Sequence, residues 1–260
     1  MYVAGIDIGS IYSKVVILQD NQLIASLVQR TGGEIKTASR RILEEALETL
    51  GLKLYDLAAV VATGYGRISV PFAEKQVTEI TCFGRAMVHL YPEVRTVIDI
   101  GGQDSKGIKI NENHQVEDFV MNDKCAAGTG RFLEVMANAL EVSLEDMGPL
   151  ALQSKSPEVI GITCTVFAES QVVSLVAEGR SKIDIIAGIH QAIAERIYGM
   201  LKMIKIEDRI AVTGGGAKNI ALVKALEKKL GREMVIPPNP QIIGAYGAAL
   251  FAQDLARKGI

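Results

Sequence analysis

The stretch "AGIDIGSIYSKVVIL" at residues 4–18 reads as a strand, a tight turn and a second strand. Apolar and β-branched residues flank Asp7, Gly9 and Ser10, which is the pattern of a turn between two strands. The same pattern returns at residues 97–110, "VIDIGGQDSKGIKI", 92 positions later. Aligning the two turns pairs the following residues: Asp7 with Asp99, Gly9 with Gly101, Ser10 with Gly102, and Lys14 with Lys106. Two copies are too few for a solenoid, so this duplication predicts two halves of similar architecture facing each other.

The rest of the chain alternates between helical and strand-like segments. Helical periodicity is visible in "TASRRILEEALETLGL" (37–52), and the strand-like "LAAVVATGYG" (57–66) follows it. After the second turn we expect, in order, a helix at about 129–141, a strand at 159–163, helices at about 167–178 and 183–204, a strand before "TGGG" (213–216), a helix at about 219–230, a short strand in "EMVIPP" (233–238), and a final helix from Gly244. This alternation predicts an α/β fold. Because no low-complexity linker separates the halves, we expect a cleft and a hinge.

Composition limits the classes of partner. The chain has 260 residues, of which 48% are apolar, yet no uncharged run approaches the roughly 20 residues that cross a bilayer. Twenty-eight basic and thirty acidic residues give a net charge of −2 without a basic cluster, so nucleic acid is not an expected partner. The N-terminus enters a strand-like segment without the pattern of a signal peptide. We therefore predict a soluble, cytoplasmic protein that is not bound to membranes.

The three cysteines, Cys82, Cys125 and Cys164, are widely spaced and contain no CxxC pair. This spacing predicts neither a disulfide framework nor a zinc ribbon. Cys125 lies in "MNDKCAAGTGRFLEVMANAL" (121–140), beside a Gly-rich turn and directly ahead of a predicted helix. That turn is either a packing feature or a means of presenting a thiolate at the positive end of the helix. If the cysteines bind a metal group, one chain does not supply enough of them.

The two Asp-x-Gly turns suggest a site for a polyphosphate. Glycine lets backbone N–H groups approach an anion closely, and two such turns facing each other could clamp a phosphate chain. Asp7 and Asp99 would then supply oxygen ligands to a hydrated Mg²⁺. A single Asp-x-Gly is more often only a strand-ending turn. A third element, "VTGGGAKN" (212–219), is a strand running into three glycines and then a helix, and it fits neither a Rossmann nor a Walker A motif.

Together, the two Asp-Gly turns and the later TGGG turn resemble the actin, Hsp70 and sugar-kinase ATPase superfamily. The resemblance implies duplicated, ribonuclease H-like halves with a nucleotide cleft between them. It assigns residues 1–95 with the C-terminal helix 244–260 to the first half and 96–243 to the second. It also identifies "TVFAESQVVSLVAEG" (165–179) and "GAYGAALFA" (244–252) as the two helices connecting the halves. The implied contacts with ATP or ADP are from the following residues: Asp7, Gly9, Ser10, Lys14, Asp99, Gly101, Gly102, Gln103, Gly214, Gly215, Gly216 and Asn219.

Within that superfamily, "IDIGGQDSK" (98–106), "NDKCAAGTGRFL" (122–133) and "CTVFAES" (164–170) closely resemble the activator component of 2-hydroxyacyl-CoA dehydratases, which is related to the ATPase subunits of benzoyl-CoA reductase. The likeness runs over nearly the whole chain and includes "ATGYGR" (62–67). It implies a homodimer that holds one [4Fe–4S] cluster through Cys125 and Cys164 of each chain. A four-iron cluster normally takes four thiolates, and a two-fold axis turns two cysteines into four. Cys82 fits a small buried core residue.

The resemblance also implies ATP-driven delivery of an electron to the dehydratase or a related iron–sulfur reductase, with ferredoxin or flavodoxin as the donor. By superfamily analogy, Asp104 and Glu169 are candidates to orient the attacking water, although either could be a solvated surface carboxylate. Lys14 and Lys106 could meet phosphate charge or simply cap a strand edge. Two other readings stay open at this point: a small-molecule, sugar-type kinase of the same fold, and an ATP-dependent switch protein without a cluster.

Overall fold

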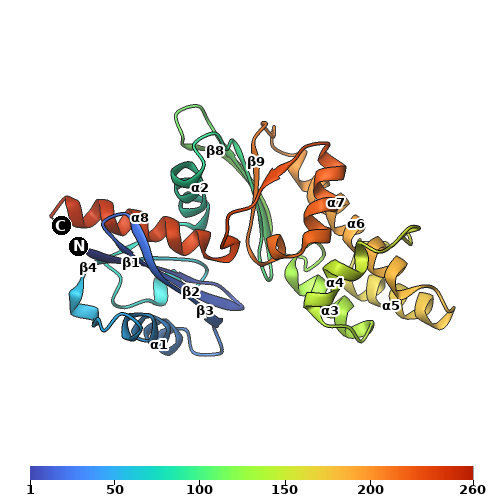
Figure 1. The fold of residues 1–260 in the computed structure, drawn as a ribbon, viewed down its shortest axis with the longest axis horizontal. Helices are drawn as coiled ribbons and strands as arrows, with labels where there is room; N and C mark the ends of the chain where they lie inside the picture. The colour runs from blue at the N-terminus through green and yellow to red at the C-terminus, as the bar shows by residue number, and fades with distance from the viewer. Residues whose placement is uncertain (260) are drawn as a thin grey trace. The chain divides into compact units, whose positions relative to one another are not determined.

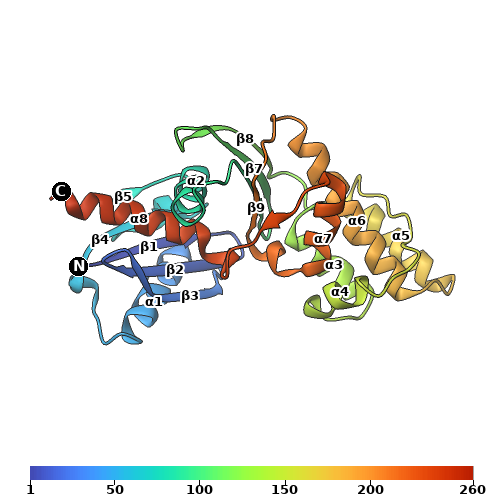
Figure 2. The ribbon, with the colours of Figure 1, turned by 45° about the horizontal axis from the view of Figure 1, so that its top comes forward.

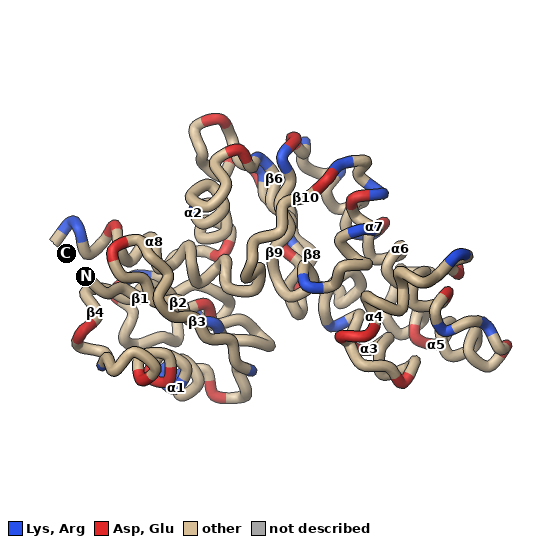
Figure 3. Tube along the Cα trace, viewed as in Figure 1, with Lys and Arg blue, Asp and Glu red and all other residues tan. Residues whose placement is uncertain are grey.

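The computed structural model describes residues 1–259, which divide into two compact units. The first unit comprises residues 1–94, 110–116 and 241–259, and the second comprises residues 95–109 and 117–240. Among residues 1–259, no helix combines the length and the apolar character needed to cross a bilayer. Figure 3 shows Lys and Arg interspersed with Asp and Glu along both units.

The first unit is built on a five-stranded sheet with the order β3-β2-β1-β4-β5. Its strands span Tyr2–Ile8 (β1), Tyr12–Gln19 (β2), Gln22–Arg30 (β3), Leu57–Thr63 (β4) and Lys75–Gln76 (β5). Central strand β1 is almost entirely buried, as expected for a strand covered on both faces. Helix α1 (Ile35–Glu48) packs on β2 and β3, whereas α8 (Ile243–Arg257) packs on β1 and β4 and against α2 (Glu79–Leu90) (Figure 1). The sheet thus lies between α1 and α8.

The second unit repeats this topology. Its five-stranded sheet has the order β10-β9-β6-β7-β8, with strands at Thr96–Ile100 (β6), Ser105–Ile110 (β7), Val116–Asn122 (β8), Ile210–Thr213 (β9) and Met234–Val235 (β10). In each sheet the first strand of the repeat pairs antiparallel with the next and parallel with the strand that ends in Thr-Gly: β1 with β2 and β4, and β6 with β7 and β9. The duplication predicted from the two Asp-Gly turns is therefore a duplication of the whole sheet.

Five helices of the second unit carry most of its core: α3 (Gly130–Ala139), α4 (Leu144–Ala151), α5 (Thr165–Ala177), α6 (Lys182–Leu201) and α7 (Ile220–Leu230). Helix α6 packs against α7 on one side and against α5 on the other, as both Figure 1 and Figure 2 show. Helix α3 packs against α5 and α4. The expected role of α5 as a connecting helix is wrong, because α5 packs inside the second unit; the chain first passes into that unit after α2, at Arg95.

The strand predicted at residues 159–163 is also wrong. Among the described residues, the segment forms no strand and pairs with none. Instead, the Gln171 side-chain amide from α5 accepts a hydrogen bond from Gly161 N (2.8 Å) and donates one to Val159 O (2.8 Å). These two bonds give the backbone of the segment the partners that a neighbouring strand would otherwise provide.

Candidate functional site

The turn between β1 and β2 holds a buried carboxylate. Asp7 is 2% exposed and lies directly opposite Lys14 in the antiparallel register, with Lys14 Nζ 3.0 Å from Asp7 Oδ2. Gly9 N donates to Tyr12 O (3.1 Å) and closes the turn, which leaves Ser10 exposed at its tip. Asp7 Oδ1 is buried and has no hydrogen-bond partner among residues 1–259. A buried carboxylate oxygen in this state is costly unless a further ligand satisfies it.

The turn between β6 and β7 repeats this arrangement with more partners. Asp99 is 3% exposed and Lys106 is 2% exposed. Lys106 Nζ lies 3.5 Å from Asp99 Oδ2 and 2.8 Å from Asp104 Oδ2. Thr213 Oγ1 donates to Asp99 Oδ1 at 3.0 Å. The second turn therefore neutralises its buried lysine with two carboxylates.

The structure brings the TGGG turn next to this second Asp-Gly turn. Asp99 and Thr213 are register partners in the parallel pair β6–β9, and Gly214 follows directly with a φ of +82°. A side chain at Gly214 would collide with Ile100 O and come within 2.8 Å of Asp99 Oδ1. Gly215 is exposed and begins a short 3₁₀ turn, whereas Gly216 is buried. Only glycine fits this combination of left-handed backbone and close approach.

The first unit has an equivalent glycine turn, which was not predicted from the sequence as a repeat of the TGGG turn. Thr63 is the register partner of Asp7 in β4, and Gly64 follows it with a φ of +89°. A side chain at Gly64 would collide with Asp7 Oδ1 and lie 2.5 Å from Ile8 O. The signal was present in the sequence, because "ATGYG" (62–66) and "VTGGG" (212–216) both end a strand.

Asn219 begins the helix after the TGGG turn. Its Oδ1 accepts a hydrogen bond from Leu222 N (3.1 Å), so Asn219 is the N-cap of α7. The same oxygen lies 3.1 Å from His190 Nε2, while His190 Nδ1 lies 2.7 Å from Ile186 O. Burial of the imidazole lowers the pKa of His190 below its usual value. This histidine ties α6 to the start of α7.

Cys164 lies at the start of a helix, and Cys125 lies in the loop before a second helix that packs against the first. Cys125 is in the loop at residues 123–129, here called the cysteine loop, which precedes α3; Asn122 Nδ2 donates to Cys125 O (2.9 Å) and fixes its entry. Cys164 is itself the N-cap residue of α5, whose start at Thr165 is earlier than predicted. Both are half-buried free thiols, and α3 contacts α5.

Two further residues considered in the sequence analysis, Cys82 and Glu169, lie in opposite surroundings, one buried and one exposed. Cys82 is fully buried in α2, where burial raises the pKa of its thiol to about 12, so it stays a neutral core residue. Glu169 is exposed on α5 and makes no side-chain hydrogen bond or ion pair with residues 1–259. In the described chain, no three or more His, Cys, Asp or Glu side chains gather as a metal site.

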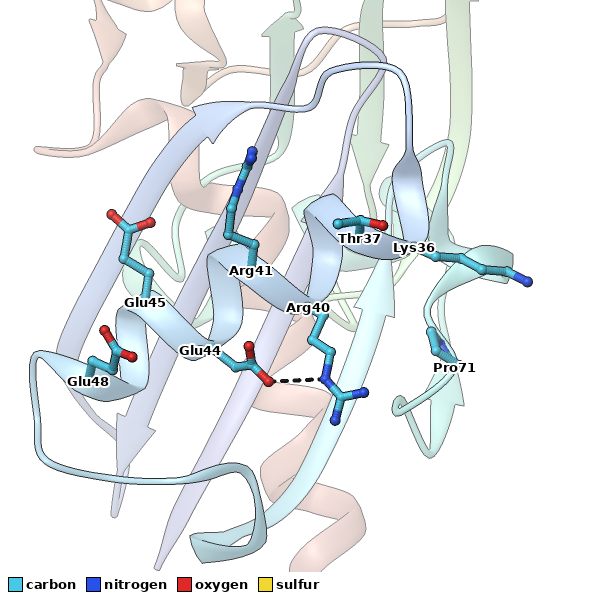
Figure 4. Close-up of a pocket in the computed structure, with 8 residues that line it drawn as sticks. All are labelled: Lys36, Thr37, Arg40, Arg41, Glu44, Glu45, Glu48 and Pro71. Atoms are coloured by element: carbon cyan, nitrogen blue, oxygen red, sulfur yellow. Dashed lines mark hydrogen bonds and ion pairs between the residues drawn. The ribbon is translucent and has the colours of Figure 1, made fainter.

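A hollow of about 630 Å³ lies on the outer face of α1, apart from the Asp-Gly turns and the cysteines. Charged side chains of the helix line it together with Pro71, and Arg40 Nε pairs with Glu44 Oε1 at 3.0 Å within it (Figure 4). None of the residues predicted for nucleotide or metal binding contributes to this hollow. It is an open, charged helix surface.

Comparison with known proteins places the chain. The profile of the BadF/BadG/BcrA/BcrD ATPase family matches residues 4–252. The chain belongs to this ATPase family. It is 46% identical to the (R)-2-hydroxyglutaryl-CoA dehydratase activating ATPase of Acidaminococcus fermentans, over 99% of both chains. It also matches the solved structure of the activator of the 2-hydroxyisocaproyl-CoA dehydratase from Clostridium difficile with bound ADPNP, at a TM-score of 0.95 and 43% identity, covering 100% of this chain and 97% of that one.

A more distant likeness confirms the fold class. The structure of a ROK family glucokinase from Streptomyces griseus in complex with glucose and AMPPNP superposes with a TM-score of 0.60 at 14% identity, covering 98% of this chain and 100% of that chain. At this identity the likeness concerns the fold alone. The predicted α/β fold with duplicated, actin-like ATPase halves is confirmed, and so is the predicted resemblance to dehydratase activators.

Proposed function

We propose that this protein is an ATP-hydrolysing activator that delivers a low-potential electron to a 2-hydroxyacyl-CoA dehydratase or a related acyl-CoA reductase. The proposal is supported by relatives that are named as activators of 2-hydroxyacyl-CoA dehydratases, one of them as an activating ATPase, and that match over nearly the full length of both chains. Ferredoxin or flavodoxin is the proposed electron donor, and the cytoplasm is the proposed location.

Both Asp-Gly turns are proposed to contribute to nucleotide binding, the first from the half made of residues 1–95 and 244–260 and the second from the half made of residues 96–243. Ser10 on one side, and Gly102 and Gln103 on the other, would offer backbone N–H groups to the phosphates. Gly9 and Gly101 would shape the two turns, because their own N–H groups donate to Tyr12 O and Asp104 O. The glycines at 214–216 and Asn219 would lie against the adenosine. Mg²⁺ prefers one or two carboxylates plus phosphate oxygens and water. The unpartnered Asp7 Oδ1 fits such a need, with Asp99 as the second carboxylate.

Asp104 and Glu169 remain the proposed carboxylates for orienting the attacking water. Asp104 belongs to the second Asp-Gly turn, and its 2.8 Å contact with Lys106 fixes the direction of its carboxylate. Glu169 lies on α5, five residues after Cys164. Of the two, we favour Asp104, because it lies in the turn that is proposed to bind the phosphates. Lys14 and Lys106 would hold the aspartates rather than meet the phosphates directly, because Lys14 is paired with Asp7 and Lys106 with Asp99 and Asp104.

The [4Fe–4S] cluster is proposed to be shared by two chains, each contributing Cys125 and Cys164. Four thiolates are the usual ligand set, and free, half-buried thiols at two adjoining helix starts suit it chemically. The cluster, when bound, would supply one-electron chemistry. Helix α5 also supports a dimer, since the side chains of Val166 (64% exposed), Phe167 (73%) and Val173 (53%) leave an apolar face without cover. A second copy of the chain would bury that face around the shared cysteines.

The observation that carries the proposal is the pair of cysteines, one in the loop before α3 and one at the start of α5, in the unit that also holds the second Asp-Gly turn. Protein purified without oxygen should be brown, with broad absorption near roughly 400 nm. Cys125→Ala and Cys164→Ala should each bleach it, because the dimer axis doubles every substitution. Cys82→Ala, the matched control, should keep the colour. A colourless wild-type protein, or a full cluster in Cys125→Ala, would reject the proposal in favour of a sugar-type kinase.

A further inference from the structure

The loop between β1 and β2 (residues 9–11, the first loop) is held from outside by one residue. Thr31, directly after β3, donates its backbone N–H to Ile11 O (2.9 Å) and its hydroxyl to Gly9 O (2.7 Å). Ser13 Oγ shares a hydrogen bond with the same hydroxyl (3.0 Å). The first loop is thus anchored by the segment that follows the third strand of its sheet.

The loop between β6 and β7 (residues 101–104, the second loop) is anchored at the equivalent place. Gly130 N donates to Gly101 O (2.9 Å) and Arg131 N donates to Gly102 O (2.8 Å). Ser105, which the duplication pairs with Ser13, donates its hydroxyl to Gly128 O (2.6 Å). Gly128, Gly130 and Arg131 all follow β8, the counterpart of β3 in sheet order. In the second unit, however, the cysteine loop comes directly after β8, and its Gly128 makes one of these contacts.

The anchoring fixes which way the second loop presents its N–H groups. The described chain has no cis peptide bond. In a trans peptide unit the C=O and the following N–H point in opposite directions. Because the carbonyls of Gly101 and Gly102 point at the start of α3, the N–H groups of Gly102 and Gln103 point away from it. Those are the groups that the proposed function assigns to the phosphates.

We propose that the Ser105 hydroxyl and the Gly130 and Arg131 amides transmit the state of the nucleotide from the second loop directly to the cysteine loop. This inference rests on the proposed function. A second loop that shifts between ATP and ADP must carry along the backbone at 128–131, and Gly128 and Thr129 are part of the cysteine loop itself. The route lies wholly within the second unit. Ser105, Gly130 and Arg131 are accordingly positioning residues for Cys125.

Hydrogen exchange of the full chain, purified without oxygen, tests this link. Exchange of peptides covering residues 123–131 should differ between saturating ADPNP and saturating ADP. Ser105→Ala should abolish that difference, whereas Ser13→Ala, which removes the corresponding hydroxyl of the first unit, should leave it. Binding of each nucleotide is checked by calorimetry and iron is assayed in the same sample.

A second pair of variants guards against misfolding of Ser105→Ala. Gly130→Pro deletes the donor to Gly101 O at the first helical position, where proline is compatible with a helix. Gly130→Ala keeps the N–H donor. It adds only a Cβ atom, which would lie 3.2 Å from Gly101 O. The difference in exchange should vanish in Gly130→Pro and persist in Gly130→Ala.

Three results would overturn the link: equal exchange at 123–131 with both nucleotides bound, an unchanged difference in Ser105→Ala and Gly130→Pro, or an equal loss in Ser13→Ala. Failure to bind ADPNP would instead reject the proposed function and the link with it. A protein that lacks iron but shows the predicted exchange pattern would keep the link and reject the cluster. The two failures are therefore distinguishable.

Discussion

Replacing Lys106 by methionine should sharply destabilise the second unit. Methionine keeps most of the packing of the lysine stem but removes the ammonium group that lies 3.5 Å from Asp99 Oδ2 and 2.8 Å from Asp104 Oδ2. Asp99, 3% exposed, would keep Thr213 Oγ1 at 3.0 Å and lose its contact with the ammonium group. Removing one partner of a buried ion pair costs about 3–5 kcal/mol. That is a large part of the roughly 5–15 kcal/mol of free energy that keeps a typical domain folded.

The assay is urea unfolding followed by circular dichroism, with two further variants. Lys109→Met, on the same strand, breaks pairs with Glu117 and Glu207, which are 47% and 40% exposed, and should therefore cost much less. Adding Asp99→Asn to Lys106→Met should recover part of the loss, because the buried charge is then gone. If Lys106→Met is no more destabilising than Lys109→Met, the buried pair does not hold the second turn as reasoned here.

Three further perturbations test other parts of the structure. In a thermal unfolding assay, Gly64→Ala should lower the stability of the protein, and the backbone strain at a φ of +89° by itself costs about 1–3 kcal/mol. Gly33→Ala, which has open space around its Cβ, should be close to neutral in the same assay. The pKa of His190 is lower in the folded protein than in the unfolded chain, so on acidification the unfolded chain binds the proton at a higher pH. The free energy of unfolding should therefore fall as the pH drops below about 6.5. His190→Gln should flatten that slope when unfolding is measured from pH 7 to 5. Asp7→Ala and Asp99→Ala should each abolish Mg²⁺-dependent ATP turnover in a phosphate-release assay while the dimer persists, and near-normal turnover in both would reject the proposed clamp.

The Asp-Gly turns could be predicted from the sequence because their signal is local. A buried strand, a polar turn residue, glycine and a second strand stand within 15 residues, and the second copy repeats Asp, Gly and Lys at the same spacing. The structure adds that Asp7 and Lys14, and likewise Asp99 and Lys106, are cross-strand partners. A spacing of seven residues across a tight turn produces that pairing.

Longer-range features could not be predicted in this way. The glycine turn at Gly64 stands much nearer to Asp7 along the chain than Gly214 does to Asp99, so one alignment offset cannot reveal both repeats. The apolar, β-branched segment around Ile160 reads as a strand, yet a strand needs a neighbour, and here the Gln171 side chain takes that place. The contacts between the second loop and Gly130 depend on the path of the chain after β8, which brings the start of α3 next to the second loop. No local sequence pattern encodes that path.

The central claim, a cluster shared by two chains, is tested most directly by counting iron and sulfide against mass. Protein purified without oxygen is sized by light scattering, and iron and acid-labile sulfide are assayed in the same fraction. Two cysteines per chain predict a dimer with about four iron and four sulfide per two chains. About four of each per single chain, or a monomer that retains its iron, would contradict the account.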